Sequence, residues 1–159
     1  MDWITLKSSD DVSKLLDRVE EFHDWYVAGF SYDPLALSED DDLNLGRFKI
    51  DVDALTVTFR WDCKSKSGEW PEVQLEFRNL RVFNFANFKD PDPIWHGIIE
   101  DTDRGWVFVD DDGDSLSEEE RANPERMCAN LLVVCGEIRW RPLAVVTTHG
   151  PDWWNDQGA

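Results

Sequence analysis

The chain has 159 residues, of which 42% are hydrophobic and 13% aromatic, so it is too apolar to be a disordered acidic segment. Its 34 Asp and Glu against 16 Lys and Arg give a formal net charge of −18 at pH 7. A negative field of this size repels nucleic acid and anionic membranes and attracts basic proteins. We therefore expect a single domain, residues 1–159, with a basic protein partner, no nucleic acid and no membrane.

The cysteines and the amino-terminal residues indicate in which cellular compartment the protein is expected. Cys63, Cys128 and Cys135 are odd in number and lack Cys-x-x-Cys spacing, so they predict neither a disulfide framework nor a zinc ribbon. We expect Cys128 and Cys135 to pack in the core or in a helix. The first residues, MDWITLKSSDD, contain no basic segment followed by an apolar run. These features predict a cytoplasmic protein without a cofactor.

The first predicted element is an amphipathic helix. Ser8 to Asp11 provide capping oxygens and negative charge for its amino-terminal N–H groups. Apolar residues then recur at helical spacing, at Val12, Leu15, Leu16, Val19 and Phe22. Alternation from Tyr26 to Tyr32 predicts a strand that ends in a turn at Asp33 and Pro34.

The strongest pattern in the chain is an alternation of apolar residues between 47 and 85. It fills every second position in 48–52, 55–61 and 73–77, which predicts a three-stranded antiparallel meander with turns near Asp53–Ala54 and in 63–72. A change of register predicts a bulge or bend between Asn79 and Phe83. The polar positions predict cross-strand pairing on a wet face: Arg47, Lys49, Asp51, Thr56, Thr58, Arg60, Gln74, Glu76 and Arg78.

The second half predicts a hairpin, a short helix and two strands. The hairpin runs from Ile94 to Val109 with its loop at 101–105, and a capping box at Ser117 and Glu120 opens the helix. One buried strand is predicted over 131–140 and another over 142–149, while Asp90 to Pro93 ends the strand before the hairpin.

Together these elements predict an α+β fold. It consists mainly of antiparallel β-sheet, with about six to eight strands. We expect the amino-terminal amphipathic helix to pack on one face of the sheet and a short helix to follow residue 116.

Few patterns in the chain point to catalysis. An EF-hand loop with Gly113 at its glycine position would take ligands from Asp110, Asp112 and Glu119, but its first ligand would be Phe108, which cannot coordinate calcium. We therefore expect a solvated turn and a helix cap there. His23, His96 and His149 each lie near acid in the sequence and could share a zinc ion, or they are three unrelated surface or capping histidines.

The nine tryptophans divide into two groups. Trp61, Trp106 and Trp140 fall in predicted strands, which favours the core. Trp70 and the pair Trp153 and Trp154 lie outside them, where they either anchor a partner or cap the core.

The composition favours a non-enzymatic, cytoplasmic protein-binding domain whose acidic loops meet a basic protein. Small acidic immunity and antitoxin proteins have this character, although no motif identifies such a family. The alternatives are a metal-dependent hydrolase that uses the histidines with neighbouring carboxylates, and a carbohydrate-binding β domain. The predicted partner-binding residues are Glu39, Asp40, Asp41, Asp42, Asp101, Asp103, Asp110, Asp111, Asp112, Asp114 and Trp70.

Overall fold

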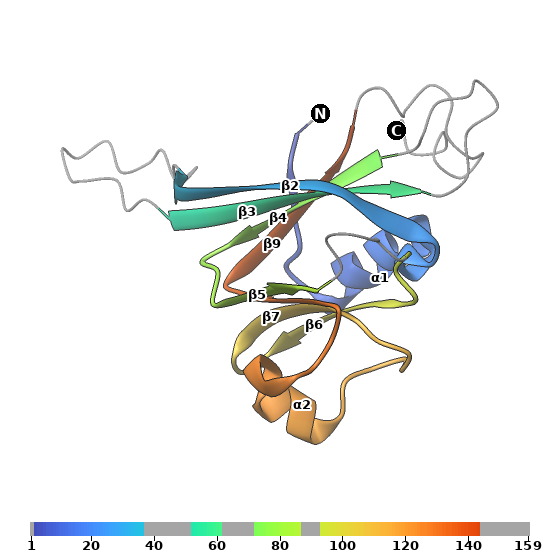
Figure 1. The fold of residues 1–159 in the computed structure, drawn as a ribbon, viewed down its shortest axis with the longest axis vertical. Helices are drawn as coiled ribbons and strands as arrows, with labels where there is room; N and C mark the ends of the chain where they lie inside the picture. Colours follow the sequence, from blue (N-terminus) through green and yellow to red (C-terminus); the bar gives the residue numbers. More distant parts are fainter. Residues whose placement is uncertain (1, 37–51, 62–71, 87–92, 144–159) are drawn as a thin grey trace.

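The computed structural model describes residues 2–36, 52–61, 72–86 and 93–143, which form two antiparallel sheets. The first sheet has the strand order β1-β9-β4-β3-β2, and the second has the order β5-β8-β7-β6. Figure 1 shows the first sheet lying over the second. The strands are β1 (Ile4–Thr5), β2 (Trp25–Ala36), β3 (Val52–Trp61), β4 (Glu72–Arg78), β5 (Val82–Phe85), β6 (Gly97–Thr102), β7 (Gly105–Asp110), β8 (Leu131–Cys135) and β9 (Glu137–Pro142).

The helices begin at the predicted caps. The helix α1 (Ser9–Arg18) is capped by the Ser8 side chain, which accepts from the Asp11 N–H. The short helix α2 (Glu118–Ala122) opens with the predicted capping box. Two 3-10 turns follow them, η1 (Glu20–Phe22) and η2 (Pro124–Arg126). The α+β fold with antiparallel sheet and an amino-terminal helix is thus confirmed. The described residues contain nine strands, among them a two-residue β1 that was not predicted.

The main core lies between the two sheets. Alternate residues of β3 and β4 point into it, and α1 closes one side of the space between the sheets (Figure 1). The second sheet, together with the helix, covers the apolar face of the first. The buried residues of this core include Phe22, Trp25, Leu55, Val57, Phe59, Val73, Leu75, Phe77, Phe108, Val133, Ile138 and Trp140.

A second, smaller core lies on the outer face of the second sheet. There Val107 and Val109 of β7 and Leu132 and Val134 of β8 pack against Leu116 from the segment that contains α2. These strands are therefore buried on both faces, which explains why their sequences are continuously apolar instead of alternating.

The predicted turn at Asp53 and Ala54 is wrong, because β3 continues through both residues. Ala54 is buried and pairs with Asp33 and Arg78. Asp53 instead supports the end of β4: its Oδ1 accepts from Leu80 N at 3.0 Å and its backbone oxygen accepts from Asn79 N at 3.1 Å. Asp53 resembles a turn residue in the sequence, but its acceptor oxygens are used by the N–H groups of Asn79 and Leu80, where the chain leaves β4.

The predicted turn at Asp33 and Pro34 is also wrong, since β2 extends to Ala36. Among the described residues β2 pairs with β3 and lies at the edge of its sheet, and an edge strand tolerates proline because it leaves some N–H groups outside the ladder. The register shifts between Asp33 and Ala36, around this proline.

The chain crosses between the sheets at two places. The predicted bend after Asn79 is confirmed: β4 ends in the first sheet, Asn79 has φ of 53°, and β5 begins in the second. The single strand predicted over 131–140 is wrong, because Gly136 separates β8 from β9 and the two lie in different sheets. A Cβ on Gly136 would lie 2.9 Å from the Asn79 Cβ, so the two crossings pack too tightly for a side chain.

Cross-strand pairs occupy the outer face of the first sheet, as the polar positions predicted. Arg139 donates to Glu76 from Nε at 3.0 Å, Gln74 donates to Thr58 at 3.2 Å, and Arg60 pairs with Glu72. Mutual pairing therefore accounts for these described polar residues without a ligand. In the described segments, neither helix has the length and apolar character needed to cross a bilayer.

Several predictions lie outside the described residues. These are the first strand of the meander, its second turn, the strand end predicted at 90–92 and most of the strand predicted over 142–149. The residues Glu39 to Asp42, Cys63, Trp70, His149, Trp153 and Trp154 also lie outside the described residues.

The two described cysteines should differ in reactivity. Cys135 is buried, as predicted, and burial raises the pKa of its thiol to about 12. Cys128 is exposed, contrary to the prediction, because it follows η2 at the rim of the smaller core. Iodoacetamide should label Cys128 in the native protein and Cys135 only after denaturation, as read by peptide mass spectrometry. Equal labelling rates in the native protein would contradict the packing of β8.

Candidate functional site

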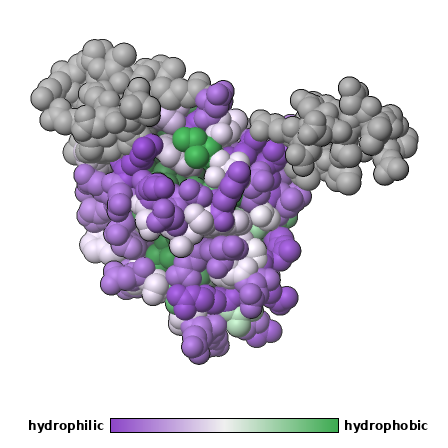
Figure 2. Space-filling view, turned by 180° about the vertical axis from the view of Figure 1, so that it is seen from behind, coloured by the Kyte–Doolittle hydropathy of each residue, from purple (hydrophilic) through white to green (hydrophobic). Residues whose placement is uncertain are grey.

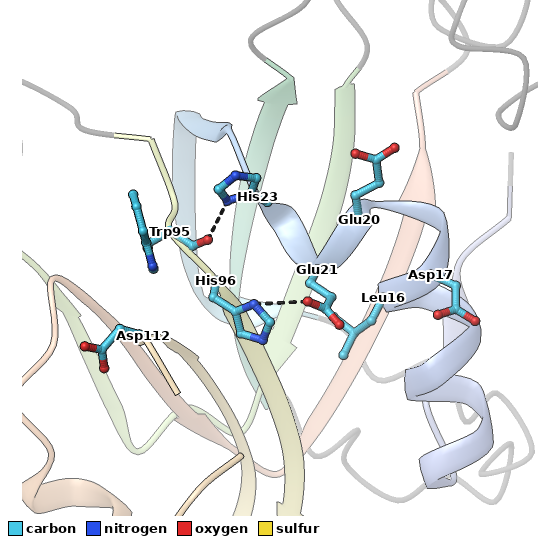
Figure 3. Close-up of a pocket in the computed structure, with 8 residues that line it drawn as sticks. All are labelled: Leu16, Asp17, Glu20, Glu21, His23, Trp95, His96 and Asp112. Carbon is cyan, nitrogen blue, oxygen red and sulfur yellow. Dashed lines mark hydrogen bonds and ion pairs between the residues drawn. The ribbon is translucent and has the colours of Figure 1, made fainter. Parts of the chain in front are cut away.

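A pocket of about 500 Å³ lies beside the end of α1. Its walls come from three separate segments: the last turn of α1, the turn η1 with its flanking residues, and the chain just before β6 (Figure 3). Asp112, from the turn after β7, completes the rim. The lining residues are Leu16, Asp17, Glu20, Glu21, His23, Trp95, His96 and Asp112.

One wall of the pocket is a left-handed turn built from residues with side chains. Glu20, Glu21, Phe22 and Asp24 have φ values of 48°, 56°, 59° and 63°. Each such conformation costs an L residue roughly 1–2 kcal/mol, because Cβ approaches the following carbonyl oxygen. Four strained residues within five positions therefore need strong compensation from packing.

The burial of Phe22 provides part of that compensation. Its side chain is fully buried, and its ring lies 5.0 Å from the ring of Phe59, 5.4 Å from that of Phe108 and 5.9 Å from that of Trp25, measured between centroids. The turn thus inserts one aromatic residue between the sheets, while its neighbours Glu20, Glu21 and His23 remain exposed at the pocket.

The opposite wall is the corner formed by residues 94–97, just before β6, which packs against Phe22. A Cβ on Gly97 would lie 3.0 Å from Phe22 Cδ2 and 3.1 Å from the Glu21 carbonyl oxygen, so the absence of a side chain lets β6 begin against the turn. Backbone hydrogen bonds join the corner to its surroundings: Ile94 N donates to Trp25 O at 2.7 Å, and Asp24 N donates to Ile94 O at 3.1 Å.

Asp110 holds the two residues between Ile94 and Gly97. Its Oδ1 accepts from the backbone N–H of Trp95 at 2.9 Å and of His96 at 3.1 Å. Burial raises the pKa of this carboxyl, and the two N–H donors act in the opposite direction. Trp95 is therefore held in place by its backbone while its indole stays 65% exposed.

Both described histidines lie in the pocket and interact with its walls. His96 Nδ1 lies 3.0 Å from Glu21 Oε2, which links the corner to the turn. His23 Nδ1 lies 2.8 Å from the Trp95 carbonyl oxygen and so donates to it, and the His23 ring contacts the Trp95 ring edge-on at 5.9 Å. Figure 3 shows His96 between Glu21 on one side and Trp95 with Asp112 on the other.

The pocket is strongly acidic. Four of its eight lining residues are Asp or Glu, and none of the eight is Lys or Arg. Figure 2 shows that hydrophilic side chains also dominate the described surface on one side of the molecule, with small hydrophobic areas between them. The pocket therefore offers carboxylates and an exposed indole, which suits a cationic group.

The predicted partner-binding residues are only partly brought together. Asp112 follows β7 and lines the pocket. Asp110 is the last residue of β7 and pairs with Gly97 in the β6–β7 hairpin, so its carboxylate holds the backbone of Trp95 and His96 and does not line the pocket. Asp111 lines a different pocket beside α2. Asp101 and Asp103 lie at the other end of the same hairpin, and five residues of strand from His96 to Asp101 span roughly 16 Å. Asp114 is exposed on the way to α2 and does not line the pocket.

The two metal sites considered in the sequence analysis can be compared with the described residues. No group of three or more His, Cys, Asp or Glu side chains in 2–36, 52–61, 72–86 and 93–143 is placed to hold a metal ion. The EF-hand alignment fails because Phe108 is buried within β7, as the sequence already indicated.

Most of the pocket was not predicted as a site. His23 and His96 were singled out, but Asp17, Glu20, Glu21 and Trp95 were assigned no role. One signal was available for Trp95: it alternates with the buried Ile94, which places the two side chains on opposite sides of an extended chain. The left-handed turn has no such signal, because its residues are not glycine or asparagine.

We find no match for this chain among protein-family models, curated proteins or solved structures.

The strain in the turn can be measured by substitution. Glu20→Gly should raise the free energy of unfolding by about 0.5–1 kcal/mol relative to Glu20→Ala, because glycine adopts the left-handed conformation without the Cβ clash but loses more chain entropy on folding. Both variants remove the same charge, so chemical denaturation compares the backbone effect alone. A glycine variant less stable than the alanine variant would show that the turn is not strained.

Substitutions of Asp110 can separate its role as a hydrogen-bond acceptor from the effect of its charge. Asp110→Ala should lower the free energy of unfolding by about 1–3 kcal/mol, because it leaves the N–H groups of Trp95 and His96 without their acceptor. Asp110→Asn keeps an acceptor oxygen and should lose less. Since burial raises the pKa of the folded carboxyl, the wild type should lose stability relative to Asp110→Asn as pH rises through that pKa. Equal stability of the alanine variant and the wild type would contradict this role.

Proposed function

We propose that the chain is a non-enzymatic protein-binding domain that engages a basic protein partner through the acidic surface around the pocket. In character it is comparable to small acidic immunity and antitoxin proteins. The observation that carries the proposal is the convergence of carboxylates from α1, η1 and the turn after β7 on one pocket without an intervening Lys or Arg. Like charges repel, so a protein without a cationic ligand gains no stability from this arrangement.

The charge of the whole chain supports the same proposal. With a net charge of −18, the protein attracts a basic surface over distances of a Debye length, which raises the rate of encounter. The local carboxylates would then fix the orientation of the bound partner. The free thiols of Cys128 and Cys135 suit a reducing compartment, so a cytoplasmic location remains part of the proposal.

The proposed surface differs from the one expected from the sequence. It keeps Asp112 and adds Asp17, Glu20 and Glu21 from α1 and η1, whereas Asp110 and Asp111 do not line the pocket. Asp101, Asp103 and Asp114 lie outside the pocket and would contribute only to the long-range field. The acidic run from Glu39 to Asp42 and Trp70 remain predictions of further contacts.

Carbohydrate binding is a second candidate, and the exposed indole of Trp95 is the observation that favours it. A sugar ring could stack on the indole and donate hydroxyl hydrogen bonds to Asp112. This candidate does not use the high density of charge in the pocket, so the protein partner is the better explanation. The hydrolase alternative has His23 and His96 in one pocket as its support.

A basic peptide tests the proposal. A labelled octa-lysine peptide should bind the full chain at low salt, and its affinity should fall steeply at about 0.3 M salt, where the Debye length is short. A pocket variant with Asp17→Asn, Glu20→Gln and Asp112→Asn should bind roughly ten-fold more weakly, as expected for three exposed ion pairs of about 0.5 kcal/mol each.

The matched control removes three acidic residues from elsewhere. Asp101→Asn, Asp103→Asn and Glu125→Gln are exposed positions outside the pocket, and together they should weaken binding by less than about two-fold. Equal losses in the two triple variants would mean that only the net charge attracts the peptide. Absence of binding at low salt would overturn the proposal, and binding of a neutral oligosaccharide instead would favour the second candidate.

A further inference from the structure

Trp95 is the most exposed large hydrophobic residue in the described part of the chain. Its exposed fraction is 65%, compared with 53% for Tyr32 and 45% for Ile4 and Phe30. Single exposed hydrophobic residues are common on proteins and need no function. Trp95 differs because it lines a pocket whose other described walls are mostly charged, so its indole is a flat apolar surface beside carboxylates.

The backbone of Trp95 is fixed before any ligand binds. The Trp95 N–H is held by Asp110, its carbonyl oxygen accepts from His23, and the preceding Ile94 is hydrogen-bonded to both Trp25 and Asp24. The His23 ring also supports one edge of the indole. A rigid aromatic side chain loses little conformational entropy on binding, which is why such residues dominate the binding energy of many interfaces.

The carboxylates nearby define the chemistry of the ligand. Asp112 lies on the same side of His96 as Trp95, and Glu21 lies on the other side (Figure 3). Glu21 already interacts with His96, whereas Trp95 is largely exposed and Asp112 is exposed, so both can contact a ligand. A ligand that stacks on the indole and pairs with the carboxylate would have flat, apolar faces and hydrogen-bond donors at its edge.

A guanidinium group meets these requirements better than an ammonium group. It is planar and weakly hydrated, it stacks on aromatic rings, and its N–H groups lie in the plane that would face a carboxylate. The lysine ammonium is compact and strongly hydrated, so it would keep more of its water and gain less from the indole. The volume of about 500 Å³ falls within the range of ordinary ligand pockets.

We infer that the pocket binds an arginine side chain of the basic partner, with its guanidinium stacked on Trp95 and paired with Asp112. This inference rests on the proposed function and adds to it the residue type that is recognised. The other carboxylates of the pocket attract the cation without contacting it in a fixed geometry: those of Asp17 and Glu20, and that of Glu21, which also interacts with His96. Trp95 is thus the specificity residue, and the acidic residues provide most of the attraction.

Peptides of equal charge separate recognition from attraction. The full chain should bind octa-arginine about two- to five-fold more tightly than octa-lysine, the gain expected for a cation stacked on an exposed indole. Trp95→Leu should remove this preference, because it should weaken the binding of octa-arginine more than that of octa-lysine. Trp95→Tyr should retain part of it, because the tyrosine ring also attracts cations.

The control is Tyr32→Leu, which removes an exposed aromatic residue of β2 that does not line the pocket, and it should leave the preference for arginine intact. Circular dichroism and thermal melting establish that each variant is folded. Equal binding of both peptides by the wild type would overturn the inference but leave the proposed function standing. A preference that survives Trp95→Leu would also overturn it, and binding of neither peptide would overturn both proposals.

Discussion

The burial of Phe22 between the two sheets is the constraint on which the pocket depends. Its ring contacts Trp25, Phe59 and Phe108, so it joins β2, β3 and β7 at one point. To place the ring there, the backbone at Glu20, Glu21, Phe22 and Asp24 adopts left-handed conformations that L residues avoid. The burial of one aromatic side chain, worth roughly 1.5–3 kcal/mol by transfer alone, offsets part of that strain, and the hydrogen bonds of the turn to Ile94 and Trp95 offset more.

The same anchor determines what the surface presents. Because Phe22 points inward, Glu20, Glu21 and His23 are exposed beside it, and because Gly97 lies against Phe22, Trp95 and His96 meet them across the pocket. Asp110 then fixes the backbone of Trp95 and His96 by accepting hydrogen bonds from both N–H groups. An acidic pocket with an exposed indole is thus a direct consequence of how the turn packs, which is why we propose that a basic partner binds there and not at the tip of the β6–β7 hairpin.

The sequence predicted the periodic parts of this structure and missed those that depend on distant packing. Alternation identified β3 and β4 correctly, and cap residues located α1 and α2, because both signals are local. Asp53, Asp33 and Pro34 resembled turns, yet tertiary hydrogen bonds and an edge position keep them in strands. The site was harder to predict than the strands, because His23 and Trp95 are 72 positions apart in the sequence. The left-handed turn brings them together, and it contains no glycine by which the sequence could have indicated it.

Amide hydrogen exchange in the free protein, resolved by NMR, tests most directly whether the pocket is built before a partner binds. The relevant amides are those of Phe22, Asp24, Ile94 and Trp95, whose acceptors are Val19, Ile94, Trp25 and Asp110. If the burial of Phe22 fixes the turn and the corner, these amides should exchange as slowly as those of β3 and β7, through global unfolding. Exchange through local opening, at rates near those of an unstructured chain, would contradict a preformed pocket.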